Sequence, residues 1–352
     1  MAKIISGIQQ IGIGVSNVYE AWNWYQENLG FDIKMFDEAA EAKLMLPYTN
    51  NQPQSRHAIL AMNMKGGGGL EIWEYKSRTP GYPKFEVELG DLGIFIAKMK
   101  TDDIKKAYQQ LKDKQQNLLS DIDTSPAGIA HFYMKDPWNN ILEIEEATEW
   151  TLDLDKSFGG NSGVAIGVSD IKKSMSFYAK ILGYDKVLSD ETAVFPDFKS
   201  LPGGKNEFRR VILQHSQARQ GAFSNLLGPS TIELIEKTDK TSTRKIYQDR
   251  LWGELGYIHL CYDISDMASL KKECEALGHP FTVDSADSFD MGEAAGHFSY
   301  IEDPDGSLIE FVETHKIPIL KKIGWYLNLQ KRDRSKSLPL WFYKVIQLTR
   351  TK

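Results

Sequence analysis

Two stretches of the chain decide the fold: IGIGVSNVYEAWNWYQENLGFD at residues 11–32 and VAIGVSDIKKSMSFYAKILGYD at residues 164–185. Corresponding positions lie 153 residues apart throughout. Each stretch opens with alternating apolar residues, which predict a strand, and continues with apolar residues at helical spacing. Asn17 and Asp170 are the predicted N-caps of the two helices. The chain therefore contains an internal strand–helix repeat.

A second repeat follows each copy of the first. HFYMKDPWNNILEIEE at 131–146 matches FSYIEDPDGSLIEFVE at 298–313, and each predicts a strand, an Asp-Pro turn and a strand. Upstream of both lies a further strand–helix pattern, at 93–111 and 259–277. The chain thus consists of four strand-helix-strand-strand-strand modules, numbered 1 to 4, at 7–76, 90–147, 160–238 and 254–314.

The repeats predict an α+β fold of four βαβββ modules. A single module has one exposed apolar sheet face, so it is not stable alone. Two modules that pair their sheets form a half-open, mixed-sheet barrel, here called a bowl, whose concave side can hold a ligand. We divide the chain into two halves of two modules each, 1–150 and 151–315, and a basic amphipathic tail, 316–352.

The composition is that of a soluble globular protein, with 41% hydrophobic and 26% charged residues. The N-terminus has no apolar segment before a cleavage site, and no run is long enough to span a membrane. Two cysteines, Cys261 and Cys274, do not make a disulfide framework and suit a reducing compartment. We expect a cytoplasmic protein that is a monomer or a homodimer.

Charge is distributed unevenly along the chain. The tail holds ten Lys or Arg residues and one acid, Asp333, whereas the whole chain carries −6. The acidic body argues against nucleic-acid binding. The tail segments 317–329 and 338–348 can each form a short amphipathic helix. They would attach the protein to an anionic membrane surface or an acidic partner, or clamp across the protein's own acidic body.

The motifs QQIGIGVSN…WYQENLGF, GVAIGVSD…FYAKILGY and DPDGSLIEF resemble those of the vicinal-oxygen-chelate superfamily. That superfamily includes glyoxalase I, methylmalonyl-CoA epimerase, extradiol dioxygenases and fosfomycin- or bleomycin-resistance proteins. The resemblance covers about residues 1–315 and implies a glyoxalase-like fold. It does not extend to glutathione recognition, because Gly14 stands where glyoxalase I carries an arginine.

The resemblance implies two metal-ligand positions in each module. One lies five residues before the Val that ends the first strand, and the other is the Glu of the last strand. Carried over to this chain, these are Gln10 and Glu71 in module 1, and His259 and Glu310 in module 4. In modules 2 and 3 only the glutamates can bind a metal, since the positions are Leu92 or Gly93 with Glu143, and Gly163 with Glu233.

The modules can pair in two ways. If module 1 pairs with 2 and module 3 with 4, as in the dioxygenases that the chain resembles, each bowl has an incomplete ligand set. If module 1 pairs with 4 and module 2 with 3, as in fused glyoxalases, one bowl collects Gln10, Glu71, His259 and Glu310. We favour the second pairing, because it explains why two modules have both residues and two lack the same one.

One imidazole and three oxygen donors suit a single divalent metal such as Zn, Ni, Mn or Fe. The metal would act as a Lewis acid for a small substrate that chelates it through adjacent oxygens. The resemblance makes Glu310 the first candidate for the catalytic base and Glu71 the second. We therefore expect a metal-dependent lyase or isomerase of glyoxalase type that transfers a proton next to a carbonyl.

Two other functions remain open at this point. The first is a small-molecule binding or resistance protein without catalytic activity. The second is an atypical extradiol-type dioxygenase, although oxygen-activating iron needs two histidines and a carboxylate. In a bowl of modules 3 and 4, the second histidine would have to stand at Gly163.

Overall fold

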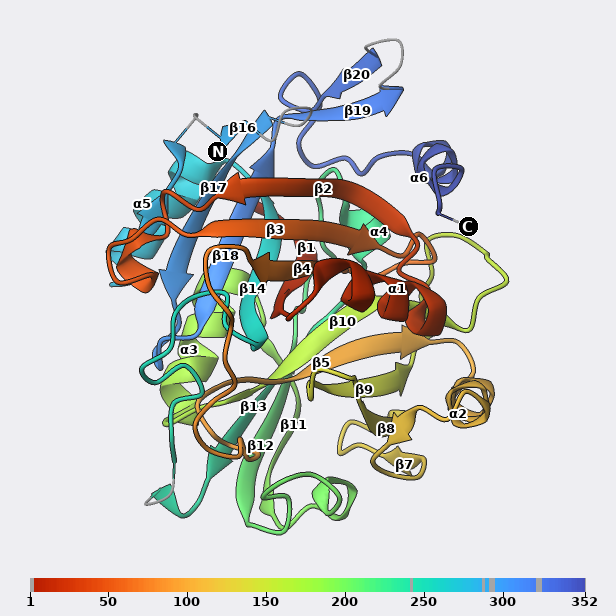
Figure 1. Ribbon diagram of the computed structural model, residues 1–352, viewed down its shortest axis with the longest axis vertical. Helices are drawn as coiled ribbons and strands as arrows, with labels where there is room; N and C mark the ends of the chain where they lie inside the picture. Colours follow the sequence, from red (N-terminus) through yellow and green to blue (C-terminus); the bar gives the residue numbers. More distant parts are fainter. Residues whose placement is uncertain (1–2, 241–242, 287–288, 291–294, 321–324, 352) are drawn as a thin grey trace.

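The structure is a computed structural model that describes residues 3–240, 243–286, 289–290, 295–320 and 325–351. Figure 1 shows two curved sheets, one above the other in this view, with helices packed around them. Within the described residues, each sheet has nine strands and contains both parallel and antiparallel neighbours. The predicted α+β fold with curled mixed sheets is therefore confirmed.

The first sheet is built by modules 1 and 4, in the order β15-β17-β18-β14-β1-β4-β3-β2, with β16 beside β17. Module 1 contains β1 (Ile4–Gly14), α1 (Val18–Leu29), β2 (Ile33–Glu41), the 3-10 helix η1 (Leu46–Tyr48), β3 (Ser55–Met62) and β4 (Gly69–Tyr75). Module 4 contains β14 (Gly256–Ser265), α5 (Met267–Ala276), β15 (Val283–Asp284), β16 (Phe289–Asp290), β17 (Ala295–Glu302) and β18 (Leu308–Thr314).

The second sheet is built by modules 2 and 3, in the order β11-β12-β13-β10-β5-β9-β8-β6, with β7 beside β8. Module 2 contains β5 (Gly93–Thr101), α2 (Ile104–Asp113), β6 (Asn117–Leu118), β7 (Asp123–Thr124), β8 (Ala130–Lys135) and β9 (Ile141–Glu146). Module 3 contains β10 (Phe158–Gly167), α3 (Ile171–Leu182), β11 (Lys186–Ala193), η2 (Pro196–Phe198), β12 (Phe208–Gln214), α4 (Ser224–Leu227) and β13 (Thr231–Lys237).

The strand order decides between the two pairings of modules. β1 of module 1 runs antiparallel to β14 of module 4, and β10 of module 3 runs antiparallel to β5 of module 2. The pairing of module 1 with 4 and of module 2 with 3 is therefore confirmed. Each sheet takes one module from each half of the sequence, so residues far apart in the chain share one concave face.

The helices of the repeat begin at the predicted N-caps. The side chain of Asn17 accepts hydrogen bonds from two backbone N–H groups at the start of α1, and Asp170 does the same for α3. Both helices end at a glycine in the left-handed conformation, Gly30 with φ 73° and Gly183 with φ 76°. These capping residues fix where each chain segment leaves the first strand of its module and returns to the sheet.

Alternation along β1 separates the core from the concave face. Ile11 and Ile13 are fully buried in the main apolar core, which also contains Tyr25 of α1. Because neighbouring side chains on a strand point to opposite faces, Gln10 and Gly12 face the other way, into the bowl. The helix side of the sheet therefore stabilises the fold, and the concave side is available for a site.

The tail differs from the expected pair of helices. It forms β19 (Lys316–Leu320), β20 (Trp325–Asn328) and α6 (Leu340–Gln347), so the helix predicted within 338–348 is confirmed. The helix predicted at 317–329 is wrong for 317–320 and 325–328, and residues 321–324 of that range lie outside the described residues. β19 and β20 pair antiparallel. Pro318 lacks a backbone N–H group, and Ile317 is β-branched; both disfavour a helix at this position.

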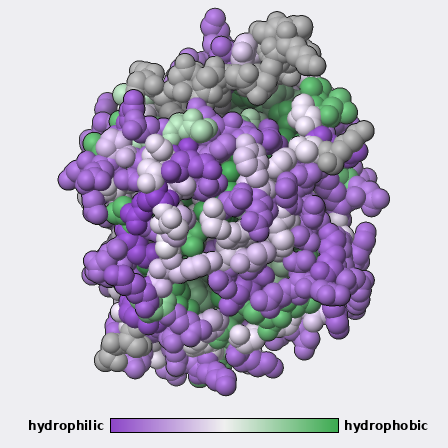
Figure 2. Space-filling model, in the orientation of Figure 1, coloured by the Kyte–Doolittle hydropathy of each residue, from purple (hydrophilic) through white to green (hydrophobic). Residues whose placement is uncertain are grey.

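The described part of the tail contacts the protein's own body, as the clamp interpretation predicts. Phe342 and Tyr343 of α6 are buried, and the Tyr343 hydroxyl donates a hydrogen bond of 3.1 Å to the Ala222 carbonyl. Leu340 and Trp341 remain about half exposed, and Figure 2 shows apolar side chains at the upper right, where α6 lies in Figure 1. Among the described residues, no helix combines the length and the apolar character needed to cross a membrane.

Candidate metal centre

Four neighbouring strands bring together the side chains of Gln10, Glu71, His259 and Glu310. In the central part of the sheet, β18, β14, β1 and β4 lie side by side in that order. Each strand contributes one of the four residues to the concave face. These are the four ligands implied by the sequence resemblance, and the structure places all of them in the bowl of modules 1 and 4.

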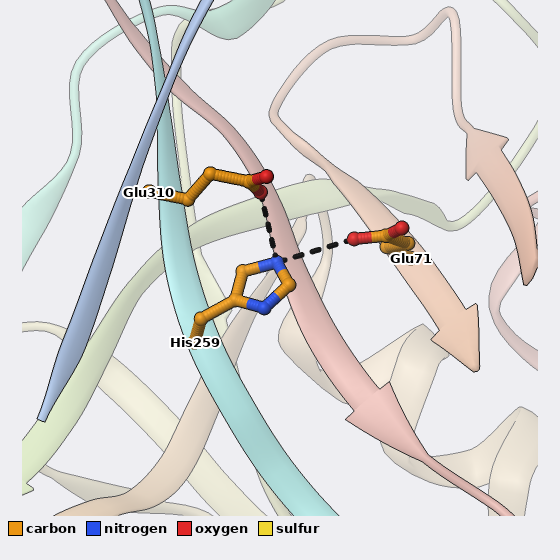
Figure 3. A group of neighbouring side chains, drawn as sticks. All are labelled: Glu71, His259 and Glu310. Carbon is orange, nitrogen blue, oxygen red and sulfur yellow. Dashed lines mark ion pairs between the residues drawn. The ribbon is translucent and has the colours of Figure 1, made fainter. Parts of the chain in front are cut away.

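The imidazole of His259 lies between the two carboxylates (Figure 3). Its Nε2 atom is 3.2 Å from a carboxylate oxygen of Glu71 and 3.1 Å from a carboxylate oxygen of Glu310. The side-chain amide of Gln10 donates a hydrogen bond of 3.4 Å to Glu310. Glu71, His259 and Glu310 each offer a ligand atom within 4.8 Å of the others.

The charges of this group depend on one another. Burial disfavours the protonated imidazole, but the negative charge and hydrogen bonding of Glu310 and Glu71 outweigh it and raise the pKa of His259 to about 10. Burial likewise opposes ionisation of Glu71, yet the hydrogen bond and charge of His259 lower the pKa of that carboxyl. Two buried carboxylates therefore require a positive charge between them, which the imidazolium supplies in this structure.

A divalent metal ion fits the same four side chains. Ligand atoms bound to one ion at about 2.1 Å lie about 3.0–3.4 Å from each other, close to the separations around Nε2 of His259. The Gln10 Oε1 atom is buried and has no hydrogen-bond partner among the described residues. A buried amide oxygen without a hydrogen-bond partner, next to two carboxylates, would be satisfied by binding to a cation. Gln10, Glu71, His259 and Glu310 are thus able to hold a metal.

Gly12 allows the imidazole to reach this position. It pairs with His259 across β1 and β14, and with Glu71 across β1 and β4. A Cβ atom on Gly12 would lie 2.4 Å from Cε1 of His259, which is closer than real contacts allow. The missing side chain therefore leaves the space in which the imidazole meets the carboxylates.

Two aromatic residues hold the imidazole from other sides. Trp252 stacks on His259 with ring centroids 6.5 Å apart and an angle of 12° between the rings. Tyr300 contacts it edge-on, with centroids 5.6 Å apart, and is the cross-strand partner of Glu310. The imidazole orientation is therefore set by packing in addition to its ion pairs. The site lies in the wall of a cavity of about 1060 Å³.

The second bowl contains the corresponding glutamates but a different cation. The ammonium group of Lys98, which is 2% exposed, lies 3.1 Å from Glu143 and 2.7 Å from Glu233. A third carboxylate, Glu145, is 3.7 Å away. These charges raise the pKa of Lys98 although burial opposes it. The lysine occupies the place among the glutamates that a metal would need.

Strand register explains why the second bowl has no equivalent of Gln10 or His259. The last-strand glutamates pair with Gly12, Cys261, Ala165 and Lys98 in modules 1, 4, 3 and 2. The ligand position lies two residues earlier, at Gln10, His259, Gly163 and Ile96. In module 2 the residue is therefore Ile96 and not Leu92 or Gly93 as predicted, because the spacing between strand and helix differs in this module.

Further charged and aromatic residues complete the second bowl. Arg210 forms ion pairs of 2.6 Å with Glu233 and Asp197, and its guanidinium lies 4.0 Å above the Phe198 ring. His131 forms a 2.7 Å ion pair with Glu143. Phe198 belongs to an apolar cluster with Phe95 and Phe208. Glu143 and Glu233 are thus engaged by side chains of the protein itself.

Some residues of these sites were not predicted from the sequence. Gly12 carried a recognisable signal, since a glycine inside a strand marks a close approach of another group. Trp252 comes from the segment between modules 3 and 4 and has no counterpart in the repeat. Lys98 lies in the alternating run GIFIAKMK, where a lysine is normally solvent-facing.

Comparison with known proteins supports the same fold. Two models of the Glyoxalase/Bleomycin resistance protein/Dioxygenase superfamily match the chain, one at residues 7–144 and one at residues 163–298. No curated protein sequence matches it. Among solved structures, glyoxalase I from Zea mays is 14% identical with a TM-score of 0.52, over 89% of this chain and 92% of that chain. A Bacillus subtilis protein proposed to be a dioxygenase is also 14% identical, with a TM-score of 0.56 over 99% and 96%.

The position of Gly12 leads to a first prediction. Gly12→Ala removes no ligand, but its methyl group displaces the His259 imidazole. We expect divalent-metal affinity to fall about 10- to 100-fold, as when groups that orient metal ligands are changed, measured by calorimetric titration. Gly81→Ala is the control, because an added methyl there meets its nearest neighbour at an ordinary 3.5 Å. Equal affinity of Gly12→Ala and the unchanged protein would show that the imidazole position is unimportant.

The second bowl leads to a stability prediction. Lys98→Met leaves buried glutamates without their central cation, so we expect the free energy of unfolding to fall by about 3–5 kcal/mol, measured by urea denaturation at pH 7.5. Lys105→Met, at an exposed position of α2, is the control and should change it by less than about 0.5 kcal/mol. A Lys98 variant as stable as this control would contradict the role of the ammonium group.

Proposed function

Since the chain belongs to the Glyoxalase/Bleomycin resistance protein/Dioxygenase superfamily, we propose that the bowl of modules 1 and 4 binds one divalent metal ion and uses it in catalysis. The ligands are Gln10, Glu71, His259 and Glu310. The protein is then a metal-dependent lyase or isomerase of glyoxalase type, which transfers a proton next to a carbonyl of a small oxygen-chelating substrate. The observation that carries this proposal is the contact of one buried imidazole with two carboxylates in the wall of a large cavity.

The residues of the site have two roles, metal binding and proton transfer. When bound, the metal supplies Lewis-acid stabilisation of negative charge on the substrate's oxygens. Glu310, which the resemblance makes the first candidate, is the base that removes the proton, and its carboxylate lies in the cavity wall within reach of a bound substrate. Glu71, on the other side of the imidazole, is the second candidate. His259 packs between Trp252 and Tyr300, which orient its ring toward the two carboxylates.

The ligand set argues against the oxygenase alternative. Oxygen-activating iron sites of this type use two histidines and one carboxylate with open positions. In this bowl the residue equivalent to His259 in the facing module is Gln10, which supplies an amide in place of a second imidazole. Oxygen uptake with catechols in the presence of Fe²⁺ is therefore not expected.

Titration of the metal-free protein with Zn²⁺ tests the proposal. We expect one site per chain, because Lys98 occupies the second bowl, and loss of that site in a Gln10→Ala/His259→Ala variant. With a pKa of about 10, His259 is protonated at pH 7.5, whereas a metal ligand must be neutral. Binding should therefore release about one proton, and this release should diminish as the pH rises through 10. Calorimetry in two buffers of different ionisation enthalpy measures both quantities.

His279→Ala is the matched control for this titration, since His279 lies outside the bowl and bonds to the Glu302 carbonyl. It should bind one Zn²⁺ as the unchanged protein does. A double variant of Gln10 and His259 that still binds one equivalent with the same affinity would refute the metal site.

Proton transfer is testable without the natural substrate. Hydroxyacetone has a carbonyl and an adjacent hydroxyl oxygen, and exchange of its C–H protons with D₂O can be followed by NMR. We expect the metal-loaded protein to accelerate this exchange and Glu310→Gln to reduce the rate about 10²- to 10⁴-fold. Glutamine retains an oxygen that can bind the metal, so the variant is expected to keep its metal. Metal content is measured in parallel to check this. If Glu310→Gln keeps its metal and exchanges protons at the original rate, Glu310 is not the base.

A further inference from the structure

The cavity of the first bowl extends well beyond the candidate metal site. Its volume of about 1060 Å³ is at the upper end of the range for small-molecule pockets. Gln10, Glu71 and Glu310 occupy only a part of its wall. The chemistry of the remaining wall therefore indicates what else a substrate must carry.

One direction away from the metal site is apolar. Leu60 is the cross-strand partner of Glu71, so their side chains lie next to each other on the concave face. Met62 follows two residues later on β3 and faces the same way, and Met64 continues this wall beyond the strand. A ligand group that leaves the metal site along β3 in the direction from Leu60 to Met64 thus meets apolar side chains.

The end of this apolar wall is built by segments from outside modules 1 and 4. Leu226 and Leu227 come from α4 of module 3, and Phe342 and Ile346 come from α6 of the tail. Together with Met62 they belong to one apolar cluster that is separate from the main core. The tail and α4 therefore close the cavity with a hydrophobic surface.

Charged side chains line a different part of the cavity. They lie on β2, on the segment after it, on β3 and at the start of β19: Lys34, Asp37, Glu38, Glu41, Lys43, Arg56 and Lys316. β2 is an edge strand of the sheet, and Asp37, Glu41 and Lys43 are exposed. The cavity is thus polar where it meets solvent and apolar at the end formed by α4 and α6.

We propose that the substrate carries an extended apolar group, such as an alkyl chain, which occupies the space between Met62 and Ile346. Its two adjacent oxygen atoms bind at the metal site, so this inference rests on the proposed function. A metabolite with charges along its whole length would leave those charges unpaired against the leucine, methionine and phenylalanine side chains. The tail is then a determinant of substrate specificity.

Straight-chain hydroxamates provide a probe that separates the two parts of the ligand. A hydroxamate chelates a metal through two adjacent oxygens, and its chain can be lengthened from acetohydroxamate to octanohydroxamate. We expect affinity for the Zn²⁺-loaded protein to rise about fourfold for each methylene, the gain for burying a CH₂ group. Calorimetry, after free metal has been removed, measures the dissociation constant of each probe.

Two neighbouring residues of α6 supply matched variants. Ile346 lines the cavity, whereas Val345 does not. Ile346→Glu should abolish the rise in affinity with alkyl-chain length and leave the affinity for acetohydroxamate unchanged. Val345→Glu should change neither the rise nor the affinity for acetohydroxamate. If Ile346→Glu does not fold, Ile346→Ser serves in its place, with a reduced increase per methylene.

The outcomes distinguish this inference from the proposed function. If acetohydroxamate binds equally well with and without the metal, or does not bind at all, the proposed metal site fails. If acetohydroxamate binds only with the metal but the affinity is the same from two to eight carbons, the metal site stands and the apolar substrate is refuted. If affinity rises with alkyl-chain length and Ile346→Glu does not alter that rise, the alkyl chain binds elsewhere and the role of the tail is refuted.

Discussion

The antiparallel pairing of β1 with β14 is the interaction on which the first bowl depends. It joins modules 1 and 4 and sets Gly12 directly opposite His259. Because Gly12 has no side chain, the imidazole lies against β1, and its Nε2 atom reaches carboxylates on both flanking strands. A shift of one residue in this pairing would turn Gln10 toward the helices and Ile11 toward the cavity. The backbone register thus determines both the core and the site.

Both bowls meet the same electrostatic requirement in different ways. Each places glutamates from two last strands on a buried concave face, and buried like charges need a cation between them. In the first bowl Gly12 and Cys261 leave room opposite the glutamates, and an imidazole enters from the neighbouring position. In the second bowl Lys98 extends from the equivalent position and supplies the cation itself. One architecture therefore places an imidazole between the glutamates of the first bowl and an ammonium group between those of the second.

The sequence predicted most of the fold, because the fold depends on short-range patterns, and the family resemblance pointed to four side chains that the structure brings together in one bowl. The repeats and the helix caps are each encoded within a few residues of one module, whereas the ligand positions are what the family resemblance implies. The preferred pairing followed from chemistry, since only modules 1 and 4 contain both ligand-type residues. The role of Lys98 was not predictable in this way, because its partner Glu233 comes from another module. The two strands at 316–320 and 325–328 were missed because their pattern of apolar and basic residues also suits a helix.

The segments outside the repeat matter most for what the first bowl can bind. Two paired modules alone would leave the concave face open, and their strands carry the residues that can hold a metal. The apolar end of the cavity comes instead from α4 and α6, which are not constrained by the strand pairing of modules 1 and 4. Substitutions in α6 can therefore change the shape and polarity of the cavity while Gln10, Glu71, His259 and Glu310 stay in place. The same reaction at the metal can then act on substrates with different attached groups. The reacting atoms contact the strands of modules 1 and 4, whereas the attached group contacts α4 and α6.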